Sequence, residues 1–315
     1  MELVGTLTGH KGCINNVVFD SHGVYCMTCG NDRTIRLWNP QKLLPIKMYS
    51  GPHNHEVNCV AISSNNSKFV SGGAESNVFI WDVIDGSVVN KFMGHTGKIT
   101  TVTYCASDNI IATGSLDTQV KIWDNRSYNK KPIQNFIDAK DSISTLETSS
   151  YEIITGSIDG RVRIYDLRKG LLITDDFIKP VTSISLSRDR DYLIVSLLGG
   201  NVHFVEKRTG DTLKSYSGHL HKEFRLNSVL DGECKIIVSG SEDGRICYWP
   251  LEGGDMMYQR AHKGPVMCIK FSMREFIKDG VLQTDLDLQA RESLKTGKQL
   301  MLSVGSDGSL KAWHI

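Results

Sequence analysis

A unit of about 42 residues recurs along this 315-residue chain, and this repeat restricts the possible folds more than any other feature. The clearest copies place an aspartate six residues before a tryptophan, with small and β-branched residues between them. Seven copies place the last residue of this unit at positions 38, 81, 123, 165, 205, 249 and 313, so only the last interval is longer. A repeat of this length, with strand-like segments in every copy, predicts an all-β, seven-bladed β-propeller with four strands per blade.

The two ends of the chain predict how this ring closes. Lys311–Ile315 ends at the third strand of the last repeat, which leaves that blade one strand short. Residues 1–8 precede the first Gly-His pair as an outer strand without a blade of its own. We therefore expect residues 1–315 to form one propeller, in which residues 1–8 complete blade seven and remove its exposed sheet edge. The extra length of that blade is an insertion at residues 272–298.

Composition excludes several classes of protein. The 36 Lys and Arg residues nearly balance the 35 Asp and Glu residues, so no net field favours nucleic acid or an acidic membrane. No apolar run is long enough to span a membrane, and Met1–His10 lacks the features of a signal peptide. We expect a cytoplasmic and nuclear protein whose eight cysteines are thiols. Cys26 and Cys29 lie three residues apart in a predicted strand, so their side chains point to opposite faces and cannot share a metal.

The repeat unit resembles the WD repeat, and this resemblance implies a buried hydrogen-bonded relay in each complete blade. The relay joins a histidine after glycine, a Ser or Thr four residues before the acid, the acid, and the tryptophan. The residues that match in blades one, three and six are His10, Thr28, Asp32 and Trp38; His95, Thr113, Asp117 and Trp123; and His219, Ser239, Asp243 and Trp249. Buried polar groups must be paired, so these His and Asp residues are interpreted as structural rather than catalytic.

Blades four and five depart from the relay pattern. Ala139 and Phe177 stand near the histidine positions, and blade five also has Val195 and Gly199 in place of the hydroxyl and the acid. Blade five is therefore the predicted weak point of the ring. The chain contains no phosphate-binding loop, nucleophile elbow or His-Glu-x-x-His motif, so no catalytic, cofactor or metal site is predicted. His53 belongs to the relay of blade two, and His55 is expected in the solvated turn that follows it.

The resemblance also places exposed positions on the top rim, the face at which the first strand of each blade begins. The candidate partner-binding residues at these positions are Glu56, Lys98, Leu116, Ile158, Leu198, Arg225 and Glu242. Leu116, Ile158 and Leu198 occupy consecutive turns that would ordinarily be polar. Exposed apolar clusters mark interaction surfaces, and the alternative is that these side chains fold back over the rim of the channel.

A second candidate surface lies on the opposite, bottom rim. Residues 111–126 and 153–168 both match a sixteen-residue box that ends in W/Y-D-x-R. The box resembles the docking element of substrate receptors for cullin-4 ubiquitin ligases, in which the terminal arginine contacts the adaptor. Arg126 and Arg168 are the corresponding residues here. The alternative is that each is solvated or paired with a carboxylate.

Several segments resemble the mitogen-activated protein kinase organizer family of WD-repeat scaffolds. They are Tyr25–Pro40, Lys91–Val102, Gly156–Arg168 and Gly218–Leu226. The resemblance implies a non-enzymatic scaffold that gathers signalling kinases and is also associated with the spliceosome. The partners expected are signalling kinases, splicing factors or a ligase adaptor, with the chain as a monomer within larger complexes. The insertion at residues 272–298 departs from the family pattern.

Overall fold

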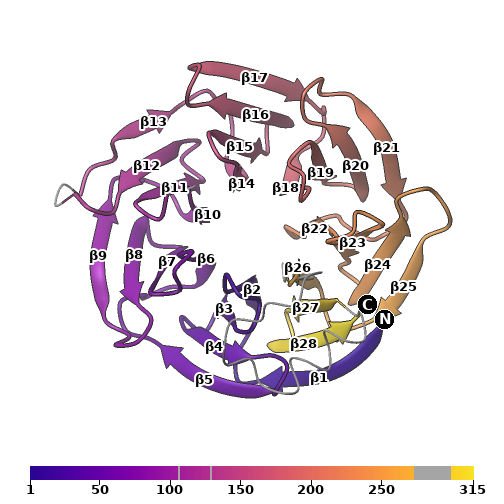
Figure 1. Cartoon of the computed structure of the whole chain (residues 1–315), viewed down its shortest axis with the longest axis horizontal. Coiled ribbons are helices and arrows are strands. Elements are labelled where there is room, and N and C mark those ends of the chain that lie inside the picture. The colour runs from indigo at the N-terminus through magenta and orange to yellow at the C-terminus, as the bar shows by residue number, and fades with distance from the viewer. Residues whose placement is uncertain (106, 128–129, 273–298) are drawn as a thin grey trace, which may run out of the picture.

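The computed structural model consists of strands arranged in a ring around a central axis (Figure 1). It describes residues 1–105, 107–127, 130–272 and 299–315. These residues form 28 strands in seven four-stranded antiparallel sheets, one for each predicted blade. The described parts of the chain contain no helix that could cross a membrane.

The first six blades follow the chain, each running from its inner strand to its outer strand. Blade one contains β2 (Ile14–Phe19), β3 (Cys26–Gly30), β4 (Ile35–Asn39) and β5 (Leu44–Tyr49). Blade two contains β6 (Val57–Ile62), β7 (Lys68–Gly73), β8 (Asn77–Asp82) and β9 (Val88–Met93). Blade three contains β10 (Ile99–Tyr104), β11 (Ile110–Ser115), β12 (Val120–Asp124) and β13 (Gln134–Phe136). Blade four contains β14 (Ile143–Thr148), β15 (Glu152–Ser157), β16 (Arg161–Asp166) and β17 (Leu171–Asp176).

The remaining blades keep the same arrangement, apart from the origin of one strand. Blade five contains β18 (Val181–Leu186), β19 (Tyr192–Leu197), β20 (Asn201–Glu206) and β21 (Thr212–Ser217). Blade six contains β22 (Ser228–Leu230), β23 (Ile236–Gly240), β24 (Arg245–Pro250) and β25 (Met257–Arg260). Blade seven contains β26 (Val266–Phe271), β27 (Leu300–Gly305) and β28 (Ser309–His314), and its outer strand is β1 (Glu2–Thr8).

Blade seven closes the ring with strands from both ends of the chain, which confirms the predicted fold and its closure. β1 pairs antiparallel with β28, from Glu2 opposite His314 to Thr8 opposite Ser309. The two termini therefore lie side by side (Figure 1). Leu7 of β1 is buried in an apolar cluster that includes residues of blade one. The N-terminal strand thus joins the last blade to the first through both backbone pairing and side-chain packing.

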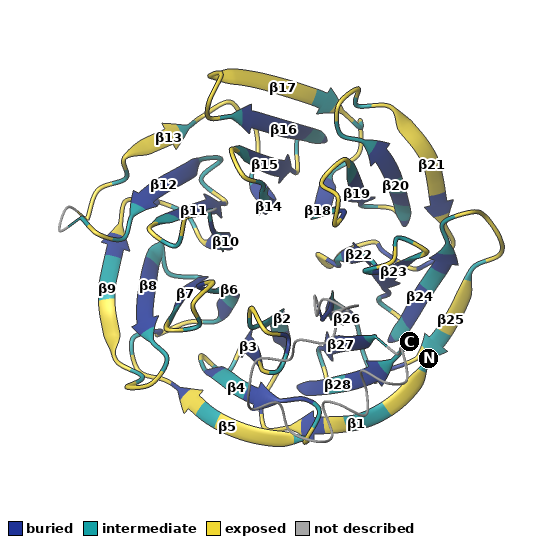
Figure 2. Ribbon diagram, in the orientation of Figure 1, coloured by how far each residue is buried: buried dark blue, intermediate teal, exposed yellow. Residues whose placement is uncertain are grey.

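The apolar core lies between neighbouring blades. Inner and middle strands are buried, whereas outer strands are largely exposed (Figure 2). One cluster packs Met27 and Ile35 of blade one against Phe69 and Trp81 of blade two, and comparable clusters join the other blades. Of the predicted insertion at residues 272–298, residues 273–298 lie outside the described residues.

Candidate partner-binding site

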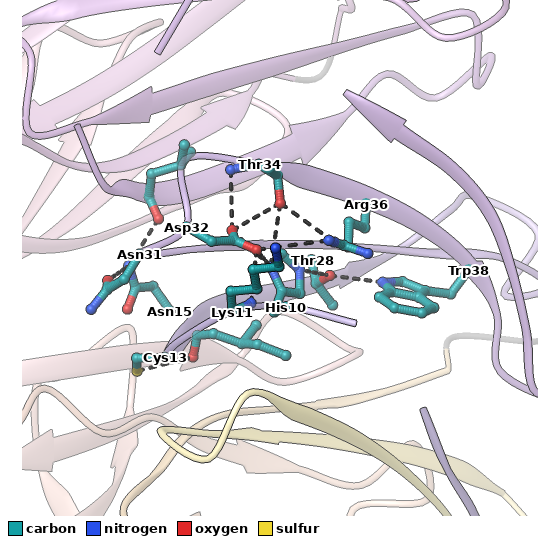
Figure 3. A network of polar contacts seen from close by, with 12 residues as sticks. His10, Lys11, Cys13, Asn15, Thr28, Asn31, Asp32, Thr34, Arg36 and Trp38 are labelled. Carbon is teal, nitrogen blue, oxygen red and sulfur yellow. Dashed lines mark hydrogen bonds and ion pairs between the residues drawn. The ribbon is translucent and has the colours of Figure 1, made fainter. Parts of the chain in front are cut away.

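The hydrogen-bonded relay of blade one runs from the top rim to the buried tryptophan (Figure 3). Nδ1 of His10 lies 2.9 Å from Oδ1 of Asp32, and its Nε2 lies 2.8 Å from Oγ1 of Thr28. The indole N–H of Trp38 donates to the same Thr28 oxygen at 2.8 Å. With a proton on Nδ1, His10 donates to the carboxylate and accepts the Thr28 hydroxyl hydrogen, so every group of the relay has a partner.

Blades two, three and seven form the same relay with different residues. The second ring nitrogen contacts a hydroxyl in each blade: His53 to Ser71 at 2.8 Å, His95 to Thr113 at 2.8 Å, and His262 to Ser303 at 2.9 Å. The acids that bind the first ring nitrogen are Glu75, Asp117 and Asp307. Trp81, Trp123 and Trp313 donate to the same three hydroxyl oxygens. The relay thus links the top of each blade to its middle strands.

The relay aspartates Asp32, Asp117 and Asp307 are held in their charged form, because the hydrogen bonds that each accepts lower its pKa. Burial by itself would raise the pKa of Asp117, but hydrogen bonds from His95 and the backbone N–H of Thr96 outweigh it and lower this pKa to about 2. Asp307 behaves in the same way, with a pKa of about 2. Burial lowers the pKa of His262, although the nearby Asp307 opposes that shift. An ionised acid beside a neutral, fully bonded histidine is a structural pair with no proton-transfer partner exposed to a substrate.

Blade six does not form the predicted relay, so the assignment of His219, Ser239, Asp243 and Trp249 as one network was wrong. Asp243 pairs instead with Arg245 at 3.3 Å, and Trp249 donates to the carbonyl of Ser217 at 3.2 Å. Ser239 accepts from the Ser228 hydroxyl at 2.8 Å and donates to the carbonyl of Gly240 at 3.0 Å. His219 precedes Asp243 by 24 residues, whereas the histidines of blades one to three precede their acids by 22.

The loop that contains His219 is stabilised by Glu242 instead. Oε1 of Glu242 accepts hydrogen bonds from the backbone N–H groups of Lys222, Glu223 and Phe224 at 2.7, 2.7 and 3.0 Å. Glu242, in the turn after β23, therefore caps the loop of residues 219–225 rather than being a free rim carboxylate. Both ring nitrogens of His219 are buried without a hydrogen-bond partner among the described residues. Burial and the adjacent His221 lower the pKa of His219 to about 4.

Blades four and five replace the relay differently. In blade four the guanidinium of Arg163 pairs with Asp159 at 2.6 Å, and both side chains are buried. In blade five, Ser196 donates to Ser228 of blade six at 2.7 Å, which joins the two blades through hydroxyl groups. The weakness of blade five remains a prediction.

The top rim carries both charged and apolar side chains. Lys98 and Glu56 form an exposed ion pair at 3.1 Å between blades three and two. The exposed fractions of Leu116 and Ile158 are 45% and 37%, and Leu198 is half-buried. The apolar side chains at the turns of blades three and four are thus partly exposed to solvent.

A belt of polar side chains surrounds the channel just below this rim. Its members donate to a backbone carbonyl of the next blade: Asn15 to Val57, Asn58 to Ile99, Thr100 to Ile143, Ser144 to Val181, and Asn227 to Ile269. Among the residues that the structure describes, blade five has no such donor to blade six, and Arg225 lies there instead. Its Nε donates to the carbonyl of Thr182 at 3.3 Å and its Nη1 to that of Thr100 at 2.7 Å. Arg225, predicted as a rim residue, therefore extends across the channel mouth.

Arg126 and Arg168 lie in matching turns of the bottom rim. The backbone N–H of each donates to the aspartate two residues earlier, Asp124 at 2.8 Å and Asp166 at 2.9 Å. The guanidinium of Arg126 also pairs with Asp124 at 3.0 Å, and that of Arg168 lies 4.4 Å from the centre of the Tyr151 ring. Both side chains remain exposed and could be contacted by another protein.

Metal-binding geometry is absent from the part of the chain that the structure describes, where no three His, Cys, Asp or Glu residues are placed to hold an ion. His55 is exposed, while His53 belongs to the relay. Burial raises the pKa of Cys29 well above its ordinary value, so this thiol stays protonated.

Comparison with known proteins gives two family matches. The family described as WD domain, G-beta repeat matches residues 1–39, and that described as nucleolar protein 10-like, N-terminal domain matches residues 32–241. Human WD repeat domain-containing protein 83 is 41% identical over 249 residues, which cover 79% of each chain. A WD repeat-containing protein of Schizosaccharomyces pombe is 36% identical over 274 residues, covering 87% of this chain and 92% of its own.

Proposed function

Because the chain belongs to the WD-repeat β-propeller family, with WD repeat domain-containing protein 83 of several vertebrates among its relatives, we propose that it is a non-enzymatic scaffold that assembles multiprotein complexes. The exposure of Leu116 and Ile158 at consecutive turns of the top rim is the observation that carries this proposal. Exposed apolar clusters are typical of surfaces that bind proteins.

The buried relay supports a scaffold rather than an enzyme. Four blades use their histidine and acid to hold strands together, and the hydroxyl of each relay contacts both the histidine and the tryptophan. A ring held in this way presents its loops in fixed relative positions. Partners bound to different blades are then kept at a high effective concentration without any new chemistry.

The complexes proposed are those of MAP-kinase-type signalling and of pre-mRNA splicing, in the cytoplasm and the nucleus. The nearly balanced charge of the chain supports contact with splicing complexes through proteins rather than through RNA. An alternative is a substrate receptor of a cullin-4 ubiquitin ligase. The matching turns that present Arg126 and Arg168 on neighbouring blades favour this second candidate.

Affinity purification from native lysate tests these proposals with three variants beside the natural chain. Leu116→Asp with Ile158→Asp changes the top rim, and Arg126→Ala with Arg168→Ala changes the bottom rim. Ile46→Asp with Met48→Asp is the matched control, because both residues are exposed on the outer strand β5. If the chain is a scaffold, the natural chain and the control should both recover kinases or splicing proteins that the top-rim variant does not recover.

Other outcomes distinguish the candidates. Recovery of a cullin adaptor that only the bottom-rim variant loses would favour the ligase receptor. If the top-rim variant retains every protein that the natural chain recovers, partner binding through that rim is refuted.

A further inference from the structure

Arg225 carries an uncompensated positive charge at the mouth of the channel. Arginine has five N–H donors, and Arg225 uses two of them, for the carbonyls of Thr182 and Thr100. The other three have no partner among the described residues, and no carboxylate of those residues lies within ion-pair distance. The inner strands that surround the guanidinium desolvate it, which lowers its pKa, although the residue as a whole is exposed to solvent.

Other charged groups near Arg225 do not neutralise it. Lys270, on the inner strand β26, lies 3.7 Å from Glu147 of blade four, so these two charges form an ion pair of their own. The neighbouring thiols of Cys59 and Cys268 are buried, and burial raises the pKa of both, so they remain uncharged. The two acids among the candidate residues of the top rim are also engaged: Glu56 pairs with Lys98, and Glu242 accepts the backbone N–H groups of residues 222–224. The guanidinium of Arg225 at the channel mouth therefore has no counter-ion among the described residues.

The apolar turns of the top rim lie beside this cation. The backbone N–H of Leu116, Ile158 and Leu198 donates to the carbonyls of Lys98, Ser142 and Pro180 at 2.9, 3.0 and 2.9 Å. These three carbonyls each lie two residues before a residue that lines the channel in the same blade, namely Thr100, Ser144 and Thr182. The three turns therefore flank the channel mouth along blades three to five. The guanidinium is held by carbonyls of blades three and five, which form the two ends of this arc.

The surrounding polar belt leaves few other donors for a ligand. Asn15, Asn58, Thr100, Ser144 and Asn227 already donate to carbonyls of adjacent blades. A ligand that reaches the channel mouth thus meets a forked cation flanked by aliphatic side chains. A carboxylate matches that fork with two parallel hydrogen bonds, and apolar neighbours of the acid match the flanking turns.

We propose that the channel mouth binds a peptide segment of a partner protein that inserts an acidic side chain between apolar residues, with Arg225 as the anchor of its carboxylate. Leu116, Ile158 and Leu198 contact the apolar residues of that segment. This inference rests on the proposed scaffold function and specifies the chemistry of the partner.

A displayed library of random decapeptides, panned in parallel against the full natural chain and its Arg225→Met variant, tests the proposal. The natural chain is expected to enrich peptides with Asp or Glu at one position between apolar residues, and the variant is expected to lose that preference. Replacing the enriched Glu by Gln should weaken binding to the natural chain about ten-fold or more and leave binding to the variant unchanged. A pool without an acidic preference, or no enriched peptide at all, overturns the proposal.

Two further measurements keep the test decisive. Because Arg225 also joins blades, urea denaturation is used to show whether the Arg225→Met variant is folded. If it is not, two other results decide the outcome: the Glu-to-Gln comparison on the natural chain, and binding to the Arg225→Lys variant, which keeps the charge but not the fork. A peptide with phosphoserine in place of Glu that binds ten-fold tighter would overturn the carboxylate assignment in favour of phosphate. Proteins that Leu116→Asp with Ile158→Asp loses but Arg225→Met retains would uphold the scaffold function and refute the anchor.

Discussion

Arg163 and Asp159 form a buried ion pair in blade four, with Nη2 of the arginine 2.6 Å from Oδ2 of the aspartate. Ala139 takes the place of the relay histidine in this blade, and the aspartate that the histidine would bind finds its partner four residues further along the chain. The backbone N–H of Lys140 also donates to Asp159, at 2.9 Å. Blade four therefore keeps the acid of the relay and pairs it with a guanidinium in place of a histidine.

Replacement of this arginine should destabilise the ring strongly. Arg163→Met leaves the buried Asp159 carboxylate without its counter-ion, which is expected to cost about 3–5 kcal/mol in the free energy of unfolding. Urea denaturation measures this change. The matched control is Arg161→Met on the same strand, because the Arg161–Asp176 pair is exposed and should contribute only about 0–1 kcal/mol. Equal effects of the two substitutions would contradict a special role for the buried pair.

Removal of a relay hydroxyl should lower the free energy of unfolding more than the small size of the group suggests. Thr113→Val keeps the shape of the side chain but removes the oxygen that contacts His95 Nε2 and accepts from Trp123. Two buried groups then lack a partner, so we expect a loss of about 2–4 kcal/mol in the free energy of unfolding. Thr174→Val, on the exposed strand β17, is the control and should change stability by less than about 0.5 kcal/mol. A Thr113→Val protein as stable as its control would refute the structural interpretation of the relay.

Because β1 closes the ring, a change to its buried leucine should destabilise the protein. Leu7→Asp places a carboxylate in the apolar cluster between blades seven and one and should lower the melting temperature by on the order of 10 °C. Leu3→Asp changes an exposed leucine of the same strand and should have little effect. Deletion of residues 1–8 should destabilise the ring further, because β28 loses its partner strand. Unchanged melting of the deletion would show that β1 does not close the ring.

The unpartnered His219 should make stability depend on pH. Its folded-state pKa of about 4 lies below the ordinary value near 6.5, so the unfolded chain binds the proton more readily between these values. The contribution of the neutral His219 imidazole to the free energy of unfolding is therefore complete above about pH 6.5. It falls as the pH drops towards 4 and does not change further at lower pH. The loss amounts to about 3 kcal/mol.

The His219→Leu variant separates this contribution from those of the other histidines. Its free energy of unfolding should fall less than that of the natural chain between pH 6.5 and 4, as measured by urea denaturation at each pH. His22→Gln, a substitution of an exposed histidine, should keep the natural dependence. The same slope in His219→Leu and in the natural chain would show that His219 is not responsible.

The repeat spacing was sufficient to predict seven blades, because strand positions follow from the periodic placement of the acid and the aromatic residue. The two ends of the chain, each lacking part of a blade, were sufficient to predict how the ring closes. The relays of blades one and three could also be read from the chain, since 22 residues separate the histidine from its acid in both. Blade six has two histidines, His219 and His221, in one loop, and the Gly-His pair indicated the first. Its longer spacing from Asp243 was the available signal that this relay would not form.

Long side chains set the limit of prediction at the candidate site. A flexible arginine can point to solvent or into the ring, so the sequence did not show that Arg163 is buried against Asp159 or that Arg225 reaches other blades. Arg225 bonds to Thr100, which lies 125 residues earlier in the chain. A substitution of Arg225 by an acid would therefore change more than the surface charge, because it would also break contacts between blades. The apolar character of the top turns, in contrast, was visible in the sequence.

Hydrogen exchange of the chain, alone and in the complex purified from native lysate, tests the central claim that partners bind the top rim of an intact ring. The account predicts new protection in the complex at the turns around Leu116 and Ile158 and at the loop of residues 222–225, with the outer strands β5 and β17 unchanged. Protection confined to the bottom turns around Arg126 and Arg168, or to the outer strands, would contradict it.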